Sequence, residues 1–453
     1  MPESTSVSLT IEQITQNFHE IAPPLNQAEA TFEAHRCLYC YDAPCTRACP
    51  THIDVPSFIK KIASGNLTGT ARVILDANPI GSTCSRVCPV EALCEGACVE
   101  NTLMKQPIQI GRLQRYAMDH VISKGIDVFA AGAANGKSVG IIGSGPAGLS
   151  CATYLARLGY AVTIYERRKK AGGLDTYGMA EYKMTQQHSA DEVAMIERLG
   201  VQFRLNCEVG RDVTFADLEA AHDVVFLSVG LGATNKLGIP GEELAGVYDA
   251  LEFIERVKTR DWASVPMAKR IAVIGAGNTA IDAVTQAKRL GAEQVLLIYR
   301  RTQKEMSAYE YEYELAKQDA VEFRWQTAPL EIVADASGQR VAALRCVRTA
   351  MQDGKLANVA GSEFDLPVEM VIKAIGQQKQ RSFLASVPNI NVDAAGRVIV
   401  STATMQTDNP KYFAGGDCVN GGAEAVDAAQ HGKHAAMGIH QFLTGEAVTF
   451  AGA

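Results

Sequence analysis

The 453-residue chain lacks several features that would place it in common functional classes. No uninterrupted apolar run approaches the roughly 20 residues that a membrane-spanning helix needs. The first residues, Met1 to Ser6, do not show the basic and then apolar pattern of a signal peptide. No basic tract is long enough to indicate nucleic-acid binding, and the net charge is −7. The chain is therefore expected to be a soluble globular protein without a membrane or nucleic-acid partner.

Cysteine, by contrast, is abundant, and eight of the twelve cysteines lie between residues 37 and 98. The first four follow the spacing C-x2-C-x4-C-x3-C before Pro50, and the second four include a Cys-Pro pair at Cys88; the eight are Cys37, Cys40, Cys45, Cys49, Cys84, Cys88, Cys94 and Cys98. Short spacings followed by proline are typical of iron–sulfur proteins, because a tight loop must present several thiolates to one compact cluster. Two such groups predict two clusters, whose ligands are expected to interleave between the groups.

Disulfides and structural zinc are two other interpretations of these cysteines. Disulfides require an oxidising compartment, and nothing at the N-terminus indicates export. Thiols kept reduced for metal binding instead predict a cytoplasmic protein. Structural zinc is the stronger alternative, because tetrahedral thiolate sites also use C-x2-C spacings.

Apolar residues recur at helical spacing around the cysteines, as at Phe58, Ile59 and Ile62 and again at Val73, Ile74 and Ala77. A further helix is expected from Ile110 to Val121. Residues 1 to about 30 are polar and contain Pro23-Pro24, so they predict a loosely packed lead-in. The segment 1–135 is thus expected to be a small α-helical domain whose loops hold the clusters.

A dinucleotide-binding pattern begins after the small-residue linker 130–136. The strand 137–142 leads into Gly143-Ser-Gly-Pro-Ala-Gly148, a helix, and a second strand that ends at Glu166. The glycines allow a pyrophosphate to approach the helix N-terminus, and the acidic residue is placed to accept hydrogen bonds from ribose hydroxyls. With all flanking features present, this G-x-G-x-x-G motif is a strong signal for a dinucleotide site.

The same unit recurs further along the chain. The strand 269–274 leads into Gly275-Ala-Gly-Asn-Thr-Ala280 and a helix, and the next strand ends in Arg300-Arg301 in place of an acidic residue. Arginine accepts a 2′-phosphate through charge-assisted hydrogen bonds, whereas a carboxylate would repel it. The second site is therefore expected to bind NADP(H), with NAD(H) as the alternative, and the first site to bind FAD.

The fold class expected from these patterns is α/β, with the helical iron–sulfur domain followed by two Rossmann-like domains, the second inserted in the first. The FAD domain is expected at 136–255 and 372–453, and the NAD(P)H domain at 256–371. Phe413-Ala-Gly-Gly-Asp417 precedes a long helix, where an aspartate can bind ribityl hydroxyls. The candidate cofactor-binding residues are Gly143, Gly145, Pro146, Ala147, Gly148, Glu166, Gly173, Leu174, Gly275, Gly277, Asn278, Thr279, Arg300, Arg301, Gly376, Gly416 and Asp417.

With these motifs in view, the chain resembles the small, electron-input subunit of bacterial dihydropyrimidine dehydrogenase, within the wider group that includes the glutamate synthase small subunit. The matching stretches are 36–40, 42–45, 86–89, 108–114, 143–148, 275–282 and 413–417. The resemblance covers nearly the whole chain. It implies two 4Fe–4S clusters, FAD and an inserted NAD(P)H domain.

The resemblance also implies a ligand set for each cluster. One cluster takes Cys37, Cys40, Cys45 and Cys98, and the other takes Cys49, Cys88, Cys94 and Gln114. The glutamine is the residue that separates the dihydropyrimidine enzyme from its relatives, and Cys84 is then a spare thiol. In the plain alternative, Cys84 is the ligand and Gln114 is an ordinary helix residue.

The implied function follows from electron counting. A nicotinamide gives two electrons as hydride, a cluster accepts one, and FAD joins the two steps. The implied partner is an FMN-containing large subunit that reduces uracil or thymine, in a heterotetramer; nothing in the chain indicates a pyrimidine pocket of its own. The alternatives are a glutamate synthase large subunit as partner, or a free-standing NADPH–acceptor reductase. No acid–base catalytic residue is predicted, because hydride transfer to flavin needs none.

Overall fold

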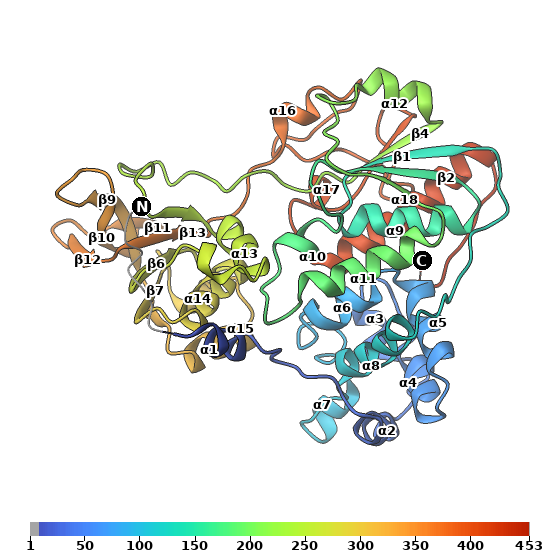
Figure 1. Ribbon diagram of the computed structural model, residues 1–453, viewed down its shortest axis with the longest axis horizontal. Coiled ribbons are helices and arrows are strands. Elements are labelled where there is room, and N and C mark those ends of the chain that lie inside the picture. Colours follow the sequence, from blue (N-terminus) through green and yellow to red (C-terminus); the bar gives the residue numbers. More distant parts are fainter. Residues whose placement is uncertain (1–8, 453) are drawn as a thin grey trace. The chain divides into compact units, whose positions relative to one another are not determined.

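The computed structural model describes residues 9–452, which form two compact units (Figure 1). One unit contains the N-terminal residues as far as Ile21, the segment Tyr177–Tyr182 and the segment Ala233–Gln378. The other begins at Ala22–Thr176 and continues through Lys183–Gly232 and the chain after Lys379. The cysteine-rich helices and the first glycine motif therefore share one unit. The predicted boundaries of three domains stay a prediction, and residues 1–8 and 453 lie outside the described chain.

The cysteine-rich region is helical, as the sequence predicted. Its helices are α2 (Gln27–His35), α3 (Pro44–Ala48), α4 (Val55–Ala63), α5 (Leu67–Ala77), α6 (Gly81–Val87), α7 (Val99–Leu103) and α8 (Ile110–Ser123). Phe58 and Ile59 of α4 are fully buried against Leu113 and Met118 of α8. The cysteines lie mostly at the ends of these helices or in the loops between them.

The prediction of a loosely packed lead-in is wrong for residues 10–18. Helix α1 (Ile11–Asn17) has a capping box at Thr10, and Phe18 is 2% exposed. Phe18 packs against Trp262, with ring centroids 5.1 Å apart, and the Asn17 amide donates to the Arg289 carbonyl oxygen at 2.9 Å. The polar composition of this segment gave no sign that Phe18 would be buried, and this one aromatic contact is enough to hold α1 in place.

The first Rossmann-like sheet is parallel, with strand order β14-β4-β1-β2-β3. Its strands are β1 (Ser138–Ile142), β2 (Ala161–Tyr165), β3 (Gln202–Arg204), β4 (Val224–Leu227) and β14 (Tyr412–Ala414). Strand β14 comes from the end of the chain, so the second Rossmann-like domain is inserted in the first, as predicted. The same unit contains α9 (Pro146–Arg157), α11 (Gln186–Glu197), α12 (Phe215–Ala221), α16 (Arg381–Leu384), α17 (Asp417–Asn420) and α18 (Ala425–Thr444), and α10 (Leu174–Tyr177) lies at its border.

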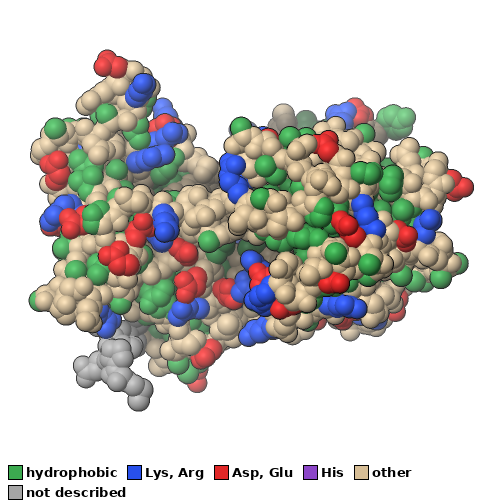
Figure 2. All heavy atoms as spheres, turned by 90° about the horizontal axis from the view of Figure 1, so that it is seen from above, with side chains coloured by type: hydrophobic (Ala, Val, Ile, Leu, Met, Phe, Trp, Pro, Cys, Tyr) green, Lys and Arg blue, Asp and Glu red, His purple; other side chains and the backbone are tan. Residues whose placement is uncertain are grey.

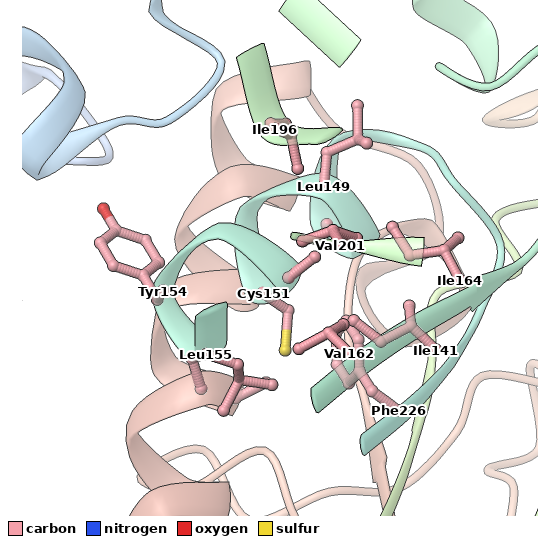
Figure 3. Close-up of a cluster of buried hydrophobic side chains, with 14 of the residues drawn as sticks. Ile141, Leu149, Cys151, Tyr154, Leu155, Val162, Ile164, Ile196, Val201 and Phe226 are labelled. Atoms are coloured by element: carbon pink, nitrogen blue, oxygen red, sulfur yellow. The ribbon is translucent and has the colours of Figure 1, made fainter. Parts of the chain in front are cut away.

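The core of this sheet explains why its strands read as apolar runs. Figure 3 shows Cys151 of α9 pointing toward Ile141, Val162 and Phe226 on the strands, while the Tyr154 ring points away from them. All five side chains are almost completely buried. Strands covered on both faces favour continuous apolar sequence, which is typical of parallel sheets.

The second parallel sheet has the order β5-β13-β6-β7-β8. Its strands are β5 (Val247–Asp249), β6 (Arg270–Ile274), β7 (Gln294–Ile298), β8 (Glu322–Arg324) and β13 (Met370–Lys373), with helices α13 (Ala250–Lys258), α14 (Asn278–Arg289) and α15 (Glu310–Gln318) and the short 3-10 helices η1 (Trp262–Ser264) and η2 (Gln303–Glu305). An antiparallel sheet of β9 (Thr327–Ala334), β10 (Val341–Gln352), β11 (Lys355–Asn358) and β12 (Phe364–Pro367) follows β8. The sequence patterns do not indicate this antiparallel sheet.

Figure 2 shows acidic and basic side chains interspersed over the face seen from above. Within residues 9–452, no helix is both long and apolar enough to span a bilayer.

Candidate functional site

The first predicted set of cysteines surrounds one cavity. Cys37, Cys40, Cys45 and Cys98 line it together with the apolar side chains of Leu38, Val55, Ile59, Val99, Ile108 and Ile110. Burial, with Cys98 nearby, raises the pKa of the Cys45 thiol to about 12. Burial also raises the pKa of Cys37, and Cys40 and Cys98 add to this effect. Positively charged iron would offset this cost, because it stabilises bound cysteines as thiolates.

A second set of cysteines lies around Cys88. A hydrogen bond with Cys84, burial and the nearby Cys49 and Cys94 raise its pKa well above the usual value. Burial raises the pKa of Cys94 well above its usual value too, with contributions from Glu95 and Cys49. Within the described residues, no three His, Cys, Asp or Glu side chains are placed to hold a single metal ion. A four-iron cluster spaces its ligands more widely, because each thiolate binds a different iron.

Cys84 contacts this second set directly, and Gln114 contacts the start of the helix that bears Cys84. Gln114 is 7% exposed on α8, and its Nε2 donates to the Gly81 carbonyl oxygen at 2.7 Å. Among the described residues its amide oxygen accepts no hydrogen bond, so a donor atom for a metal remains. Cys84 is 4% exposed on α6 and contacts Cys88. Both predicted alternatives for the eighth ligand therefore remain.

Glu192 of α11 forms hydrogen bonds with the first turn of α6, the helix that bears Cys84. The Glu192 carboxylate accepts hydrogen bonds from Ser82 N at 2.8 Å, Thr83 N at 3.3 Å and Thr83 Oγ1 at 2.5 Å. Burial raises the pKa of Glu192 to about 7, although these donors favour its charged form. No motif in the sequence pointed to this residue.

The first glycine turn has the geometry of a pyrophosphate cradle. Gly143 has φ +99°, and Gly145 is the N-cap of α9, followed by Pro146 and Ala147. A Cβ on Gly145 would meet no heavy atom within 4 Å, whereas one on Gly148 would lie 2.2 Å from the Gly143 carbonyl oxygen. The turn therefore leaves open space at the helix N-terminus, where unpaired N–H groups and the helix dipole favour an anion.

Glu166 lies at the end of β2, where the motif predicts it, but protein donors already surround its carboxylate. Its Oε2 accepts from Ser144 Oγ at 2.6 Å and Ser144 N at 3.1 Å, and its Oε1 accepts from Arg168 N at 2.8 Å. A carboxylate has about four acceptor sites, so capacity for a ribose hydroxyl remains. Ser144, inside the glycine motif, is the partner that the sequence analysis missed.

Four other candidate flavin residues belong to the same unit. Gly173 has φ +56°, and a Cβ there would lie 2.7 Å from the Gly145 Cα, so it borders the glycine turn directly; Leu174 follows and is 38% exposed. Gly416 has φ +74°, and a Cβ there would approach the Ala147 Cβ at 3.2 Å. Burial raises the pKa of Asp417, the first residue of α17.

The second glycine turn opens into a cavity of about 660 Å³. Gly275, Gly277, Thr279, Arg300 and Gly376 all line it. Asn278 begins α14, and its Oδ1 accepts a hydrogen bond from Tyr309 N at 3.2 Å. A Cβ on Gly275 would lie 2.1 Å from the Ala374 carbonyl oxygen, so this turn needs a glycine. These residues form a site of the size expected for a dinucleotide.

The two arginines at the end of β7 differ in position. Arg300 borders the cavity, whereas Arg301 does not line it and lies 4.0 Å from Glu305. Asn235 and Lys373 also border the cavity, and neither was anticipated from the sequence. Lys373 is held by Glu242 at 3.3 Å and Asp249 at 3.2 Å.

Comparisons with known protein families agree with this arrangement. Residues 14–126 match the family described as dihydropyrimidine dehydrogenase domain II, 4Fe-4S cluster, and residues 137–432 match pyridine nucleotide-disulphide oxidoreductase. The chain is 36% identical to the glutamate synthase [NADPH] small chain of Escherichia coli over 94% of both chains. It is 33% identical to the NAD-dependent dihydropyrimidine dehydrogenase subunit PreT of the same organism, over 95% of this chain and 98% of that one.

Solved structures show the same fold at low sequence identity. Mycobacterium tuberculosis FprA in complex with NADPH matches with a TM-score of 0.54 and 19% identity, over 69% of this chain and 87% of that one. The thioredoxin reductase of T. acidophilum matches with a TM-score of 0.53 and 23% identity, over 67% of this chain and 98% of that one.

The fold and sites define an NAD(P)H-dependent flavin and iron–sulfur oxidoreductase. The chain belongs to the pyridine nucleotide-disulphide oxidoreductase family, in the group that contains glutamate synthase small chains and the PreT subunits of NAD-dependent dihydropyrimidine dehydrogenase. The predicted family, fold class and class of enzyme are thereby confirmed.

Proposed function

We propose that this chain is an electron-input subunit that oxidises NADPH, or NADH, and passes single electrons through two 4Fe–4S clusters to an FMN-containing partner that reduces uracil or thymine. Bound FAD would accept hydride and release electrons singly, and each cluster would accept one. The observation that carries the proposal is that both cysteine sets and the first glycine turn belong to one compact unit. Within it, Cys49 and Cys88 pack against the core around α9.

The residues divide the work as follows. Gly143, Gly145 and Gly148 leave room for the flavin pyrophosphate at the N-terminus of α9. Asp417 begins α17, shortly after strand β14, and would bind the ribityl hydroxyls. Arg300 beside the second cavity would bind the 2′-phosphate of NADPH. Cys37, Cys40, Cys45 and Cys98 would hold one cluster, and Cys49, Cys88, Cys94 and Gln114 the other.

The first experiment measures iron, labile sulfide and flavin in the anaerobically purified chain, and then its activity. Close to eight irons and one FAD per chain are expected, with NADPH-dependent dye reduction and no turnover of uracil. Flavin without iron after reconstitution would overturn the proposal. Uracil reduction by the chain alone would overturn the division of labour with a partner.

The eighth ligand has its own test. Gln114→Ala is expected to shift the EPR signal or potential of one cluster, whereas Cys84→Ser is expected to leave both unchanged. The opposite pair of results would assign the site to Cys84, which its contact with Cys88 also permits.

The small subunit of glutamate synthase is the second candidate, favoured by 36% identity to the Escherichia coli protein over 94% of each chain. Tagged chain would then copurify with a partner that has glutaminase activity. Copurification with an FMN protein that reduces uracil would support the first candidate instead.

A further inference from the structure

Helix α18 contains a lysine that none of the cofactor motifs explains. Lys433 is 0% exposed, and lysine is almost never fully buried unless it is paired. Its Nζ donates to three backbone carbonyl oxygens, those of Thr51 at 3.1 Å, Ala451 at 2.8 Å and Gly452 at 3.0 Å. Within residues 9–452 it forms no ion pair with a carboxylate. A positive charge is therefore placed inside the protein with only carbonyl dipoles beside it.

The carbonyl of Thr51 connects this charge to a proposed cluster ligand. Thr51 follows Cys49 by two residues, and its Oγ1 lies 3.3 Å from the Cys49 Sγ. Burial lowers the pKa of Lys433 to about 8, and the negative groups that oppose this shift are Cys49 and Asp76. Asp76 is already paired with Arg157. Cys49, and the cluster it would bind, is thus the negative centre that remains for Lys433 to stabilise.

The residues just before Lys433 contact the flavin side of the same unit. His431 Nδ1 accepts a hydrogen bond from Gly416 N at 3.1 Å, in the loop that leads to Asp417. A Cβ on Gly432 would lie 2.3 Å from the Ala147 carbonyl oxygen, so α18 presses directly on the first turn of α9. Residues 431, 432 and 433 therefore contact the aspartate loop, the glycine turn and the cysteine loop in succession. This fixes the position of the lysine relative to both sites.

We propose that Lys433 is a positioning residue for electron transfer, whose buried charge raises the reduction potential of the cluster held by Cys49. The inference rests on the proposed function and adds a residue to it. Reduction places an extra negative charge on a cluster, and cluster potentials depend on net charge, hydrogen bonding and exposure. A cation in a low-dielectric interior acts on that charge far more strongly than it would in water. Lys433 thereby favours electron flow from the flavin to this cluster.

A purely structural role is the competing explanation, because Lys433 also holds the C-terminal segment. That segment has a second anchor: the Phe450 ring packs on the Tyr154 ring with centroids 4.4 Å apart. Phe450→Ala therefore loosens the segment while it leaves the lysine charge in place. It is the matched control for a change that removes the charge.

The test is an EPR-monitored redox titration of the anaerobic full-length chain with both clusters loaded. Lys433→Met and Lys433→Gln are expected to lower the reduced-to-oxidised ratio of one cluster about tenfold at a fixed potential, a shift of about 59 mV for one electron. Lys433→Arg and Phe450→Ala are expected to stay within about twofold of the wild type, and Phe450→Ala to lower the thermal midpoint.

Three outcomes would overturn the inference. In the first, Lys433→Met and Lys433→Gln keep the wild-type potential with full iron content. In the second, Phe450→Ala shifts the cluster potential as much as the two neutral variants do. Both neutral variants could also lose the cluster, which would make Lys433 a structural residue. Iron analysis separates these results from failure of the proposed function, in which the wild-type chain itself would hold no iron.

Discussion

The two glycine turns show how one topology is adapted to two ligands. Each turn joins a central parallel strand to a helix, β1 to α9 and β6 to α14, and each strand that follows lies beside the first. The third motif position is Gly148 in one turn and Ala280 in the other. A Cβ on Gly148 would lie 2.2 Å from Gly143 O, whereas the Ala280 methyl is accommodated fully buried. The first helix is thus packed more closely on its turn than the second.

The strand ends differ in the same way. Glu166 is 6% exposed, and hydrogen bonds from Ser144 and Arg168 fix the position of its carboxylate. Arg300 borders an open cavity. The buried carboxylate of Glu166 and the guanidinium of Arg300 occupy equivalent positions and favour different groups on the ribose. The carboxylate favours a hydroxyl, and the guanidinium favours a phosphate.

The largest effect is expected from exchanging the third motif residue. Gly148→Ala forces a methyl group against a backbone carbonyl, which must shift the turn, so the bound flavin is expected to fall more than tenfold. Flavin absorbance per chain measures this loss. The reverse change, Ala280→Gly, adds no atom and is expected to leave the KM for NADPH within about twofold. Equal effects of the two variants would contradict the difference in packing.

Arg300→Ala is expected to raise the KM for NADPH by about 10- to 100-fold and to leave that for NADH nearly unchanged. Hydrogen bonds to charged groups contribute about 1.5–3 kcal/mol, which corresponds to this range. Arg301→Ala, at the residue that does not line the cavity, is the matched control and is expected to change neither constant more than about threefold. Steady-state kinetics with NADPH and NADH measure both constants. A larger effect of Arg301→Ala than of Arg300→Ala on the KM for NADPH would contradict the prediction.

The next prediction compares two buried carboxyl groups, one in each unit. Burial raises the pKa of Glu192 to about 7, and a raised pKa means that the folded state favours the neutral acid. Its contribution to stability is therefore complete below about pH 4.5 and is lost as the pH rises through 7. At about 1.4 kcal/mol per pKa unit, this loss amounts to about 3 kcal/mol. Glu192→Gln is expected to remove that dependence in urea denaturation between pH 4.5 and 8.

Glu181 provides the contrast, because Arg260 at 2.5 Å and Lys258 at 3.8 Å accompany its carboxylate. Glu181→Gln removes the counter-charge of a buried lysine and is expected to destabilise its unit throughout the pH range. If Glu192→Gln were instead destabilising at every pH, the hydrogen bonds to Ser82 and Thr83 would outweigh the burial of its charge.

The smallest effect is expected at the contact between α9 and the cluster helices. The Tyr154 hydroxyl donates to the Asp76 carbonyl oxygen of α5 at 3.0 Å. Tyr154→Phe is expected to cost about 1 kcal/mol and to speed the loss of iron on warming. Tyr165→Phe removes a hydroxyl that contacts His222 within the sheet region and is expected to leave iron loss unchanged. Iron absorbance during a thermal ramp distinguishes the two variants.

The sequence by itself determined the local elements and the identity of the ligand-binding motifs. Glycine turns, apolar strands and the start of α8 follow from backbone sterics and periodicity, which act over a few residues. The cysteine spacing likewise indicated two sets of thiols before any fold was known. The sequence did not predict the antiparallel sheet of β9 to β12. Its strands show little alternation of apolar and polar residues, and their pairing depends on contacts between separate segments of the chain.

Only the tertiary structure decided which distant residues act on these motifs. Glu192 lies 109 residues from Thr83, and Lys433 lies 382 residues from Thr51. The sequence around Glu192 and Lys433 is typical of charged residues on the exposed face of a helix, because no neighbouring residue requires their burial. Burial and its electrostatic consequences arise only when helices from separate segments pack together, and this packing is what places charge beside the cysteines.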